Sequence, residues 1–224
     1  MKRIILNIIL FFPIIFLFFS IILVLCLRSG PIKKTPLMLK REIQFRGDGI
    51  STQQYWVALS KISADAVKAI TMSEDDRFLE HRGVDIQELR KMYYTHKETG
   101  LRGCSTITQQ VAKNCFTLCS DTFIRKVLEL YWASLIEIFW SKERILEVYL
   151  NIVEVGKGLY GIEAAAQEYF NCSSANMTLH DAAELAACLP NPLELSPHNI
   201  WEYKSAKVEK LIFRLKKGDL SVKI

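Results

Sequence analysis

A continuous apolar run opens the chain, and segments with apolar residues at helical spacing follow it. Between residues 4 and 27 nearly every side chain is apolar, and the run is broken only by Asn7, Pro13 and Ser20. About 20 apolar residues can span a bilayer as a helix, whereas a buried core helix of this length normally keeps a polar face. A cleaved signal peptide has a shorter apolar region that ends in small residues. We therefore predict a retained transmembrane anchor over residues 1–28.

The rest of the chain indicates a mostly α fold. Residues 29–50 are polar and contain several glycines and prolines, so we expect an irregular tether there. Residues 51–224 are expected to form one domain, because the apolar spacing is helical and shows no convincing strand alternation. The expected helices cover residues 64–80, 122–140, 142–150, 162–170, 178–190 and 200–216, with Ser141 and Thr178 as N-caps.

Charge and cysteine content exclude some classes of protein. The net charge is +5, but seven of the 29 basic residues precede Glu42, where no acidic residue occurs. Beyond that point 24 acidic residues outnumber the remaining basic ones, so the basicity belongs to the anchor region, where it would meet anionic lipid headgroups. No stripe of basic and aromatic residues indicates nucleic-acid binding. Cys115 and Cys119 have no accompanying histidine pair, so a zinc site is not expected.

The first segment that could carry chemistry begins at Glu74. On a helix, Glu74, Phe78 and His81 would share one face. A carboxylate beside an aromatic ring is partly desolvated, which raises its pKa and suits it to act as a general base near neutral pH. The alternative is an ordinary acidic helix end whose carboxylates are solvated.

The second segment offers hydroxyls, amides and an ammonium group. Ser105 and Thr106 lie at the expected start of a helix, and Gln109 and Lys113 are four residues apart on one of its faces. The free N–H groups of a helix N-terminus favour anions, and a lysine one turn in adds a positive charge. This segment is either a phosphate site or an N-capped polar helix.

The third segment places Arg125 and Lys126 within reach of Glu129 on one helix. They are either intrahelical ion pairs or two cations for a pyrophosphate with a second carboxylate beside them. A fourth segment, which ends in Tyr149-Leu150-Asn151, has the character of a scaffold helix.

In this order the segments resemble the peptidoglycan glycosyltransferases of family 51, most closely the monofunctional biosynthetic transglycosylases. The family pattern Glu-Asp-x-x-Phe-x-x-His-x-Gly starts at Glu74, and Gly-x-Ser-Thr-Ile-x-Gln-Gln-x-x-Lys-Asn covers residues 103–114. Arg-Lys-x-x-Glu starts at Arg125, and Lys-x-x-Ile-Leu-x-x-Tyr-Leu-Asn ends at Asn151. The resemblance extends over residues 55–192. One such motif would be weak evidence, but several in the same order along the chain are highly specific for the family.

The resemblance implies a lysozyme-like helical catalytic domain at the outer face of the bacterial inner membrane. Its reaction would polymerise lipid II into β-1,4-linked glycan strands and release polyprenyl pyrophosphate. Glu74 would deprotonate the acceptor hydroxyl, and Glu129 would assist at the donor side. The resemblance places substrate binding on Asp75, Phe78, His81, Ser105, Thr106, Gln109, Gln110, Lys113, Asn114, Arg125, Lys126 and Asn151.

The same resemblance sets expectations for partners and cofactors. Lipid II, the nascent glycan strand, inner-membrane lipids and other cell-wall synthesis proteins are the implied partners. No cofactor is required, although some family members use a divalent cation (Mg²⁺ or Mn²⁺) that could bridge Asp75 and the pyrophosphate. The apolar, aromatic and basic stretch at residues 89–94, with Leu101 and Arg102, either enters the membrane interface or forms a mobile loop in water.

One departure and two rival functions remain open. Relatives often carry an arginine where this chain has Asp121, and Lys97 or Arg102 could replace the missing cation. A lysozyme-like or lytic hydrolase would need two carboxylates but no cluster of cations beside them. A non-catalytic, membrane-tethered protein would bind lipid II without forming polymer.

Overall fold

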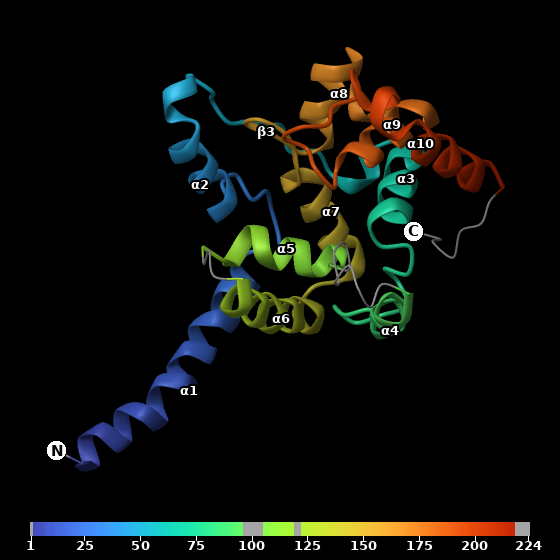
Figure 1. The fold of residues 1–224 in the computed structure, drawn as a ribbon. Coiled ribbons are helices and arrows are strands. Elements are labelled where there is room, and N and C mark those ends of the chain that lie inside the picture. The colour runs from blue at the N-terminus through green and yellow to red at the C-terminus, as the bar shows by residue number, and fades with distance from the viewer. Residues whose placement is uncertain (1, 96–104, 119–121, 218–224) are drawn as a thin grey trace.

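The computed structural model describes residues 2–95, 105–118 and 122–217 and confirms a mostly α fold. Ten α-helices account for most of the described residues (Figure 1). They are α1 (Lys2–Cys26), α2 (Pro36–Gln44), α3 (Ala64–Glu74), α4 (Ile86–Thr95), α5 (Ile107–Phe116), α6 (Thr122–Phe139), α7 (Lys142–Ile152), α8 (Ile162–Phe170), α9 (Leu179–Cys188) and α10 (Ile200–Lys217). Short 3₁₀ turns lie at Arg46–Asp48, Leu59–Lys61 and Ser174–Asn176.

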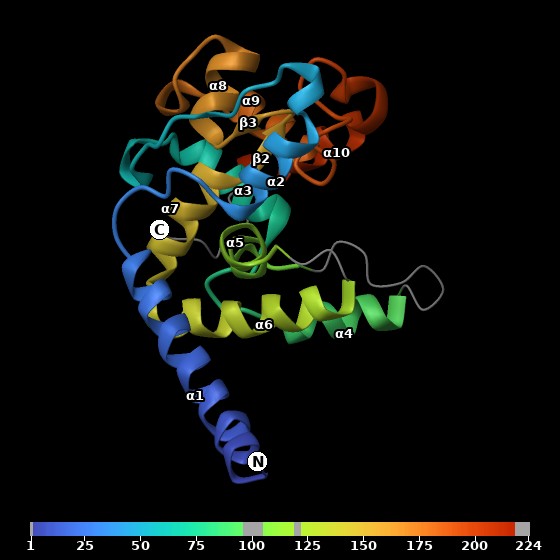
Figure 2. The ribbon, with the colours of Figure 1, turned by 90° about the vertical axis from the view of Figure 1, so that its left-hand side faces the viewer.

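Helices α5 and α3 each pack against several others. Helix α5 packs on both α6 and α7, and α3 packs on α9 and α10 (Figures 1 and 2). Helices α4 and α6 lie on the side of the body from which α1 projects, and α8 lies at the opposite end. The core between these layers is apolar and contains large, fully buried side chains such as Ile107, Ile145 and Tyr149.

A small sheet that the sequence did not indicate lies beside α8. Its order is β1-β3-β2, with β1 (Gln53–Gln54) parallel to β3 (Leu159–Tyr160) and β2 (Glu154–Gly156) antiparallel to it. The strands are two or three residues long, too short to show alternation in the sequence. Gly158 turns the chain between β2 and β3 with φ of +72°, a conformation that glycine adopts without strain.

Helix boundaries were predicted best where a side chain caps the helix. Ser141 accepts a hydrogen bond from the N–H of Arg144, and Thr178 forms a capping box with Asp181, as the sequence indicated. The prediction of one helix over residues 64–80 is wrong, because α3 ends at Glu74 and Asp75 has non-helical angles (φ −160°, ψ 76°). Glu74, Phe78 and His81 therefore do not share a helical face.

The irregular tether expected over residues 29–50 is also wrong in part, because α2 lies within it. Thr35 caps this helix, with its Oγ1 accepting from Met38 N at 3.2 Å, and Pro36 occupies the first turn. The side chain of Met38 is fully buried in the core, and α2 packs against α5. This segment is consequently part of the folded body.

Helix α1 is continuous and touches the body at its C-terminal half. The side chains of α1 are described from Phe11 onward, and the ring of Phe16 stacks on Tyr131 at 5.5 Å. Trp140 Nε1 donates to Val24 O at 2.8 Å, and Arg144 donates to Leu27 O at 2.9 Å. In the part of the chain that the structure describes, we find no helix that is both long and apolar enough to cross a membrane.

Candidate active site

A large cleft of about 930 Å³ lies between α2, the end of α3, α5, α6 and α10. The segment 189–193, which follows α9, closes one side of it. Its lining combines acids, cations and amides. Among the sequence-predicted residues, the lining includes Glu74, Ser105, Gln109, Gln110, Lys113, Asn114, Arg125, Lys126 and Glu129. The structure thus brings together the three segments that the sequence placed about 20 residues or more apart.

Asp75 holds together two of the segments that line the cleft, the end of α3 and the start of α5. Its side chain is buried, with Oδ1 2.8 Å from His81 Nε2 and Oδ2 accepting from the N–H of Ile107 at 2.9 Å. Ile107 begins α5, so the carboxylate satisfies one of the free N–H groups at a helix N-terminus. Thr106 strengthens the junction, because its hydroxyl donates to Gly83 O at 2.7 Å and its Oγ1 accepts from Gln109 N. The end of α3 is thereby locked to the start of α5.

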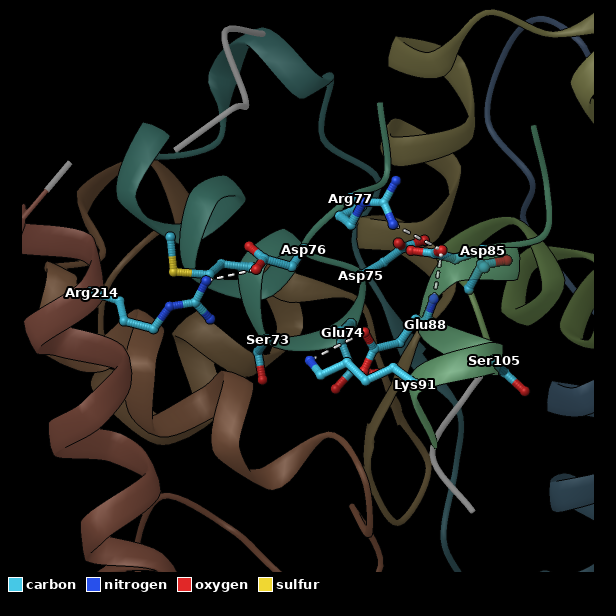
Figure 3. A pocket seen from close by; sticks show the side chains of 12 residues that line it. Ser73, Glu74, Asp75, Asp76, Arg77, Asp85, Glu88, Lys91, Ser105 and Arg214 are labelled. Atoms are coloured by element: carbon cyan, nitrogen blue, oxygen red, sulfur yellow. Dashed lines mark hydrogen bonds and ion pairs between the residues drawn. The ribbon is translucent and has the colours of Figure 1, made fainter. Parts of the chain in front are cut away.

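Glu74 is the last residue of α3 and points away from this lock. It lines both the cleft and a neighbouring pocket of about 370 Å³, in whose wall Figure 3 shows it close to Ser73. Gln110 Nε2 donates to Glu74 Oε2 at 2.9 Å, while Tyr149 donates to the other end of the same amide at 3.4 Å. Burial raises the pKa of Glu74, and the Gln110 hydrogen bond and the charge of Lys207 oppose that rise. A carboxylate of this kind is suited to accept a proton near neutral pH.

Glu129 organises the cations on the opposite wall. It is buried on α6, with Oε1 3.1 Å from Arg125 Nε and Oε2 3.4 Å from Lys126 Nζ. Lys126 also donates to Gln109 Oε1 at 2.9 Å and to Ser105 Oγ at 3.2 Å. These contacts confirm the convergence expected from their spacing and hold two positive groups at the cleft surface.

Lys113 adds a third cation to this wall. It lines the cleft from α5, and no other described residue hydrogen-bonds or ion-pairs with its ammonium group. Burial lowers the pKa of Lys113, whereas the nearby Glu129 raises it. An anion bound in the cleft would favour the charged form of this lysine. The arrangement can therefore hold a phosphate-bearing group in the cleft that Glu74 also lines.

Three residues assigned to substrate binding by resemblance lie outside both pockets. Phe78 is fully buried in the core, with Lys142 Nζ 4.4 Å from its ring centre. His81 is buried against Asp75, and the Asn151 side chain bonds both the N–H and the C=O of Val57 at 2.8 Å. The structure places these residues in support of the cleft. The positions of Lys97, Arg102 and Asp121 lie outside the described residues.

Asp75 is poorly placed to hold a divalent cation. Both of its oxygens face protein donors, and its side chain is only 4% exposed. Among the described residues no group of three or more His, Cys, Asp and Glu side chains could hold a metal ion. The expected bridge from Asp75 to a pyrophosphate does not fit these contacts.

The cleft also contains residues that sequence reasoning missed. Arg41 on α2 forms a two-pronged ion pair with Glu154, at 2.8 and 2.9 Å, and both line the cleft. Lys207 on α10 lines it near Glu74. Arg41 and Glu154 are 113 residues apart, and Lys207 belongs to no motif, so no local pattern marked them.

Comparison with known proteins identifies related chains. The family model described as transglycosylase matches residues 42–216. The biosynthetic peptidoglycan transglycosylase of Bacteroides thetaiotaomicron is 44% identical over 206 residues, which cover 90% of this chain and 83% of the relative. The proteins of the same name from Caulobacter vibrioides (39% over 212 residues, 94% of this chain and 90% of the relative) and Chromohalobacter salexigens (43% over 194 residues, 85% and 83%) are also similar.

The contact between Gln110 and Glu74 predicts a change in proton affinity. In Gln110→Leu the carboxylate loses a hydrogen bond that favours its charged form, so the pKa of Glu74 should rise further above its usual value. NMR titration of ¹³C-labelled glutamate carboxyls measures this shift. Gln167→Leu, which removes a similar bond to Glu163 on the surface, should leave Glu74 unchanged. An unaltered Glu74 titration in Gln110→Leu would contradict the assigned contact.

Proposed function

The chain belongs to the transglycosylase family and is a peptidoglycan glycosyltransferase, and we propose that it polymerises lipid II into β-1,4-linked glycan strands. The growing strand is the donor, a fresh lipid II is the acceptor, and polyprenyl pyrophosphate is released. The observation that carries this proposal is the shared cleft, which is lined both by Glu74, a carboxylate whose pKa is raised by burial, and by the cations Lys113, Arg125 and Lys126.

Glu74 acts as the general base in this proposal. It takes the proton of the acceptor 4-hydroxyl, whose oxygen then attacks the anomeric carbon of the donor while the bond to pyrophosphate breaks. Attack in line on an α-linked donor gives a β linkage in a single displacement, so no covalent enzyme intermediate is needed. The hydrogen bond from Gln110 orients the carboxylate.

Lys113, Arg125 and Lys126 neutralise the departing pyrophosphate. That group leaves as a stable anion, so it needs fixed positive charge more than a proton donor. Glu129 holds Arg125 and Lys126 in place, which gives the second carboxylate a role on the donor side without proton transfer. Ser105, Gln109, Gln110 and Asn114 supply hydroxyl and amide groups for sugars and phosphates.

Helix α1 serves in this proposal as a single-pass anchor that places the domain on the extracytoplasmic side of the inner membrane. Its sequence is apolar throughout residues 4–27 apart from Asn7, Pro13 and Ser20. Substrate and product are both bound to lipid, so an anchor would raise their effective concentration at the cleft. The anchor corresponds to residues 1–28, and the segment containing α2 connects it to the domain.

Apolar residues on α4 and α6 support a second contact with the bilayer. Tyr94 on α4 is 77% exposed, and Phe123 and Ile138 on α6 are 79% and 70% exposed. Both helices lie on the side of the body from which α1 projects (Figures 1 and 2). Aromatic and apolar side chains on one face are typical of helices that lie in the membrane interface.

Polymerisation of labelled lipid II by the purified full chain tests the proposed reaction. Wild type should form long glycan strands, and Glu74→Gln should lower the rate by at least ~100-fold, because the amide cannot accept the proton. Glu80→Gln changes an exposed acid outside the cleft and should retain activity. Comparable polymer from Glu74→Gln and wild type would reject the base, and release of muropeptides would indicate a hydrolase.

Photo-crosslinking tests the membrane contact. With benzoylphenylalanine in place of Tyr94 or Phe123, the full chain in vesicles should form covalent lipid adducts, because these side chains would reach the acyl boundary. The same replacement of Glu168, which is exposed on α8 at the far end of the body, serves as the control. Equal adduct yield at all three positions, measured by mass spectrometry, would show that α4 and α6 do not face the bilayer.

A further inference from the structure

A small groove continues the cleft between α2 and α5. Its volume is about 50 Å³, and α6 contributes to it through Arg125. Figure 1 shows α2 above the end of α5 from which the chain passes into α6. The lining residues are Pro36, Leu37, Lys40, Lys113, Asn114, Thr117, Leu118 and Arg125. Four of these, namely Leu37, Lys113, Asn114 and Arg125, also line the main cleft, so the two cavities are continuous at the cationic wall.

The inner end of the groove is built to meet a polar group. Lys113 and Arg125 place positive charge there. Asn114 lies beside them and lines both cavities, so its amide is placed to hydrogen-bond a ligand oxygen at their junction.

The groove also carries apolar side chains. Pro36 and Leu37 lie on its α2 side together with Lys40, and Leu118, which follows α5, lines it with 70% of its surface exposed. Beyond Leu118 the next described helix, α6, begins with exposed apolar residues, among them Phe123 at 79% and Val127 at 51%. Apolar side chains therefore occur both in the groove and at the start of α6.

We propose that this groove binds the first isoprene units of the polyprenyl chain attached to the pyrophosphate of the donor. The inference rests on the proposed function and deepens it. The prenyl chain is joined directly to the phosphates, so when Lys113 and Arg125 hold those phosphates, the first apolar atoms must leave the cleft close to them. The groove is continuous with these two cations and adds the apolar side chains of Pro36, Leu37 and Leu118 beside them, as the prenyl chain follows the pyrophosphate in the ligand.

Helix α2 thereby becomes a determinant of substrate class. Leu37 lies in both cavities, where it would separate the pyrophosphate region from the prenyl region. A sugar pyrophosphate without an apolar chain would make only the polar contacts. The groove would add affinity by removing apolar surface of the chain from water.

Binding of two probes to the full chain in nanodiscs tests this groove. Wild type should bind geranyl pyrophosphate, which carries two isoprene units, more tightly than inorganic pyrophosphate. Leu118→Ser and Leu37→Ser should each lower the affinity for geranyl pyrophosphate by about tenfold, because each removes apolar contact with the prenyl chain. Neither replacement should change the affinity for inorganic pyrophosphate. Leu39→Ser, on α2 but outside the groove, is the matched control.

The outcomes separate the groove from the proposed function. If wild type bound the two probes with equal affinity, or if Leu118→Ser bound geranyl pyrophosphate as wild type does, the proposal that the groove binds the prenyl chain would be rejected. The proposed role of the cationic wall would be unaffected. Absence of inorganic pyrophosphate binding would instead count against the cationic wall and the proposed function. Leu118 is largely exposed, so its replacement does not threaten the fold even if Leu37→Ser does.

Discussion

The buried carboxylate of Asp75 is the constraint on which the rest of the site depends. It joins the residue after α3, the turn that contains His81 and the first N–H of α5. An unpaired carboxylate at this depth would be strongly unfavourable, so its partners must stay in place. Because Glu74 precedes Asp75 and because Gln110 and Lys113 follow Ile107 on α5, this one interaction sets the base beside its amide partner and brings Lys113 into the same cleft.

The charges of the cleft are balanced in a way that favours an anionic ligand. Burial raises the pKa of Glu74 and lowers that of Lys113, so the folded protein alone destabilises the charged form of both groups. Glu129 offsets part of the positive charge on the opposite wall. A bound pyrophosphate would stabilise the cations and leave Glu74 as the group able to accept a proton.

Local sequence patterns predicted much of this structure, and long-range contacts account for most of what they missed. Ser141 and Thr178 marked helix starts because capping depends on neighbours within one turn. The contacts of Glu129 with Arg125 and Lys126 were predictable for the same reason, because the three residues lie about one turn apart on α6. Arg41 and Lys207 reach the cleft from distant segments, and α2 is stabilised by Met38 packing in the core rather than by its own pattern. Phe78 and Asn151 show that membership of a motif can reflect support of a site as well as contact with its ligand.

A crystal structure of the Glu74→Gln protein with lipid II in the cleft would test the central claim most directly. The account predicts that a sugar 4-hydroxyl lies within hydrogen-bonding distance of the side chain at position 74, while a pyrophosphate contacts Lys113 and Arg125. A pyrophosphate bound away from these cations, or an acceptor hydroxyl that faces a different carboxylate, would contradict it.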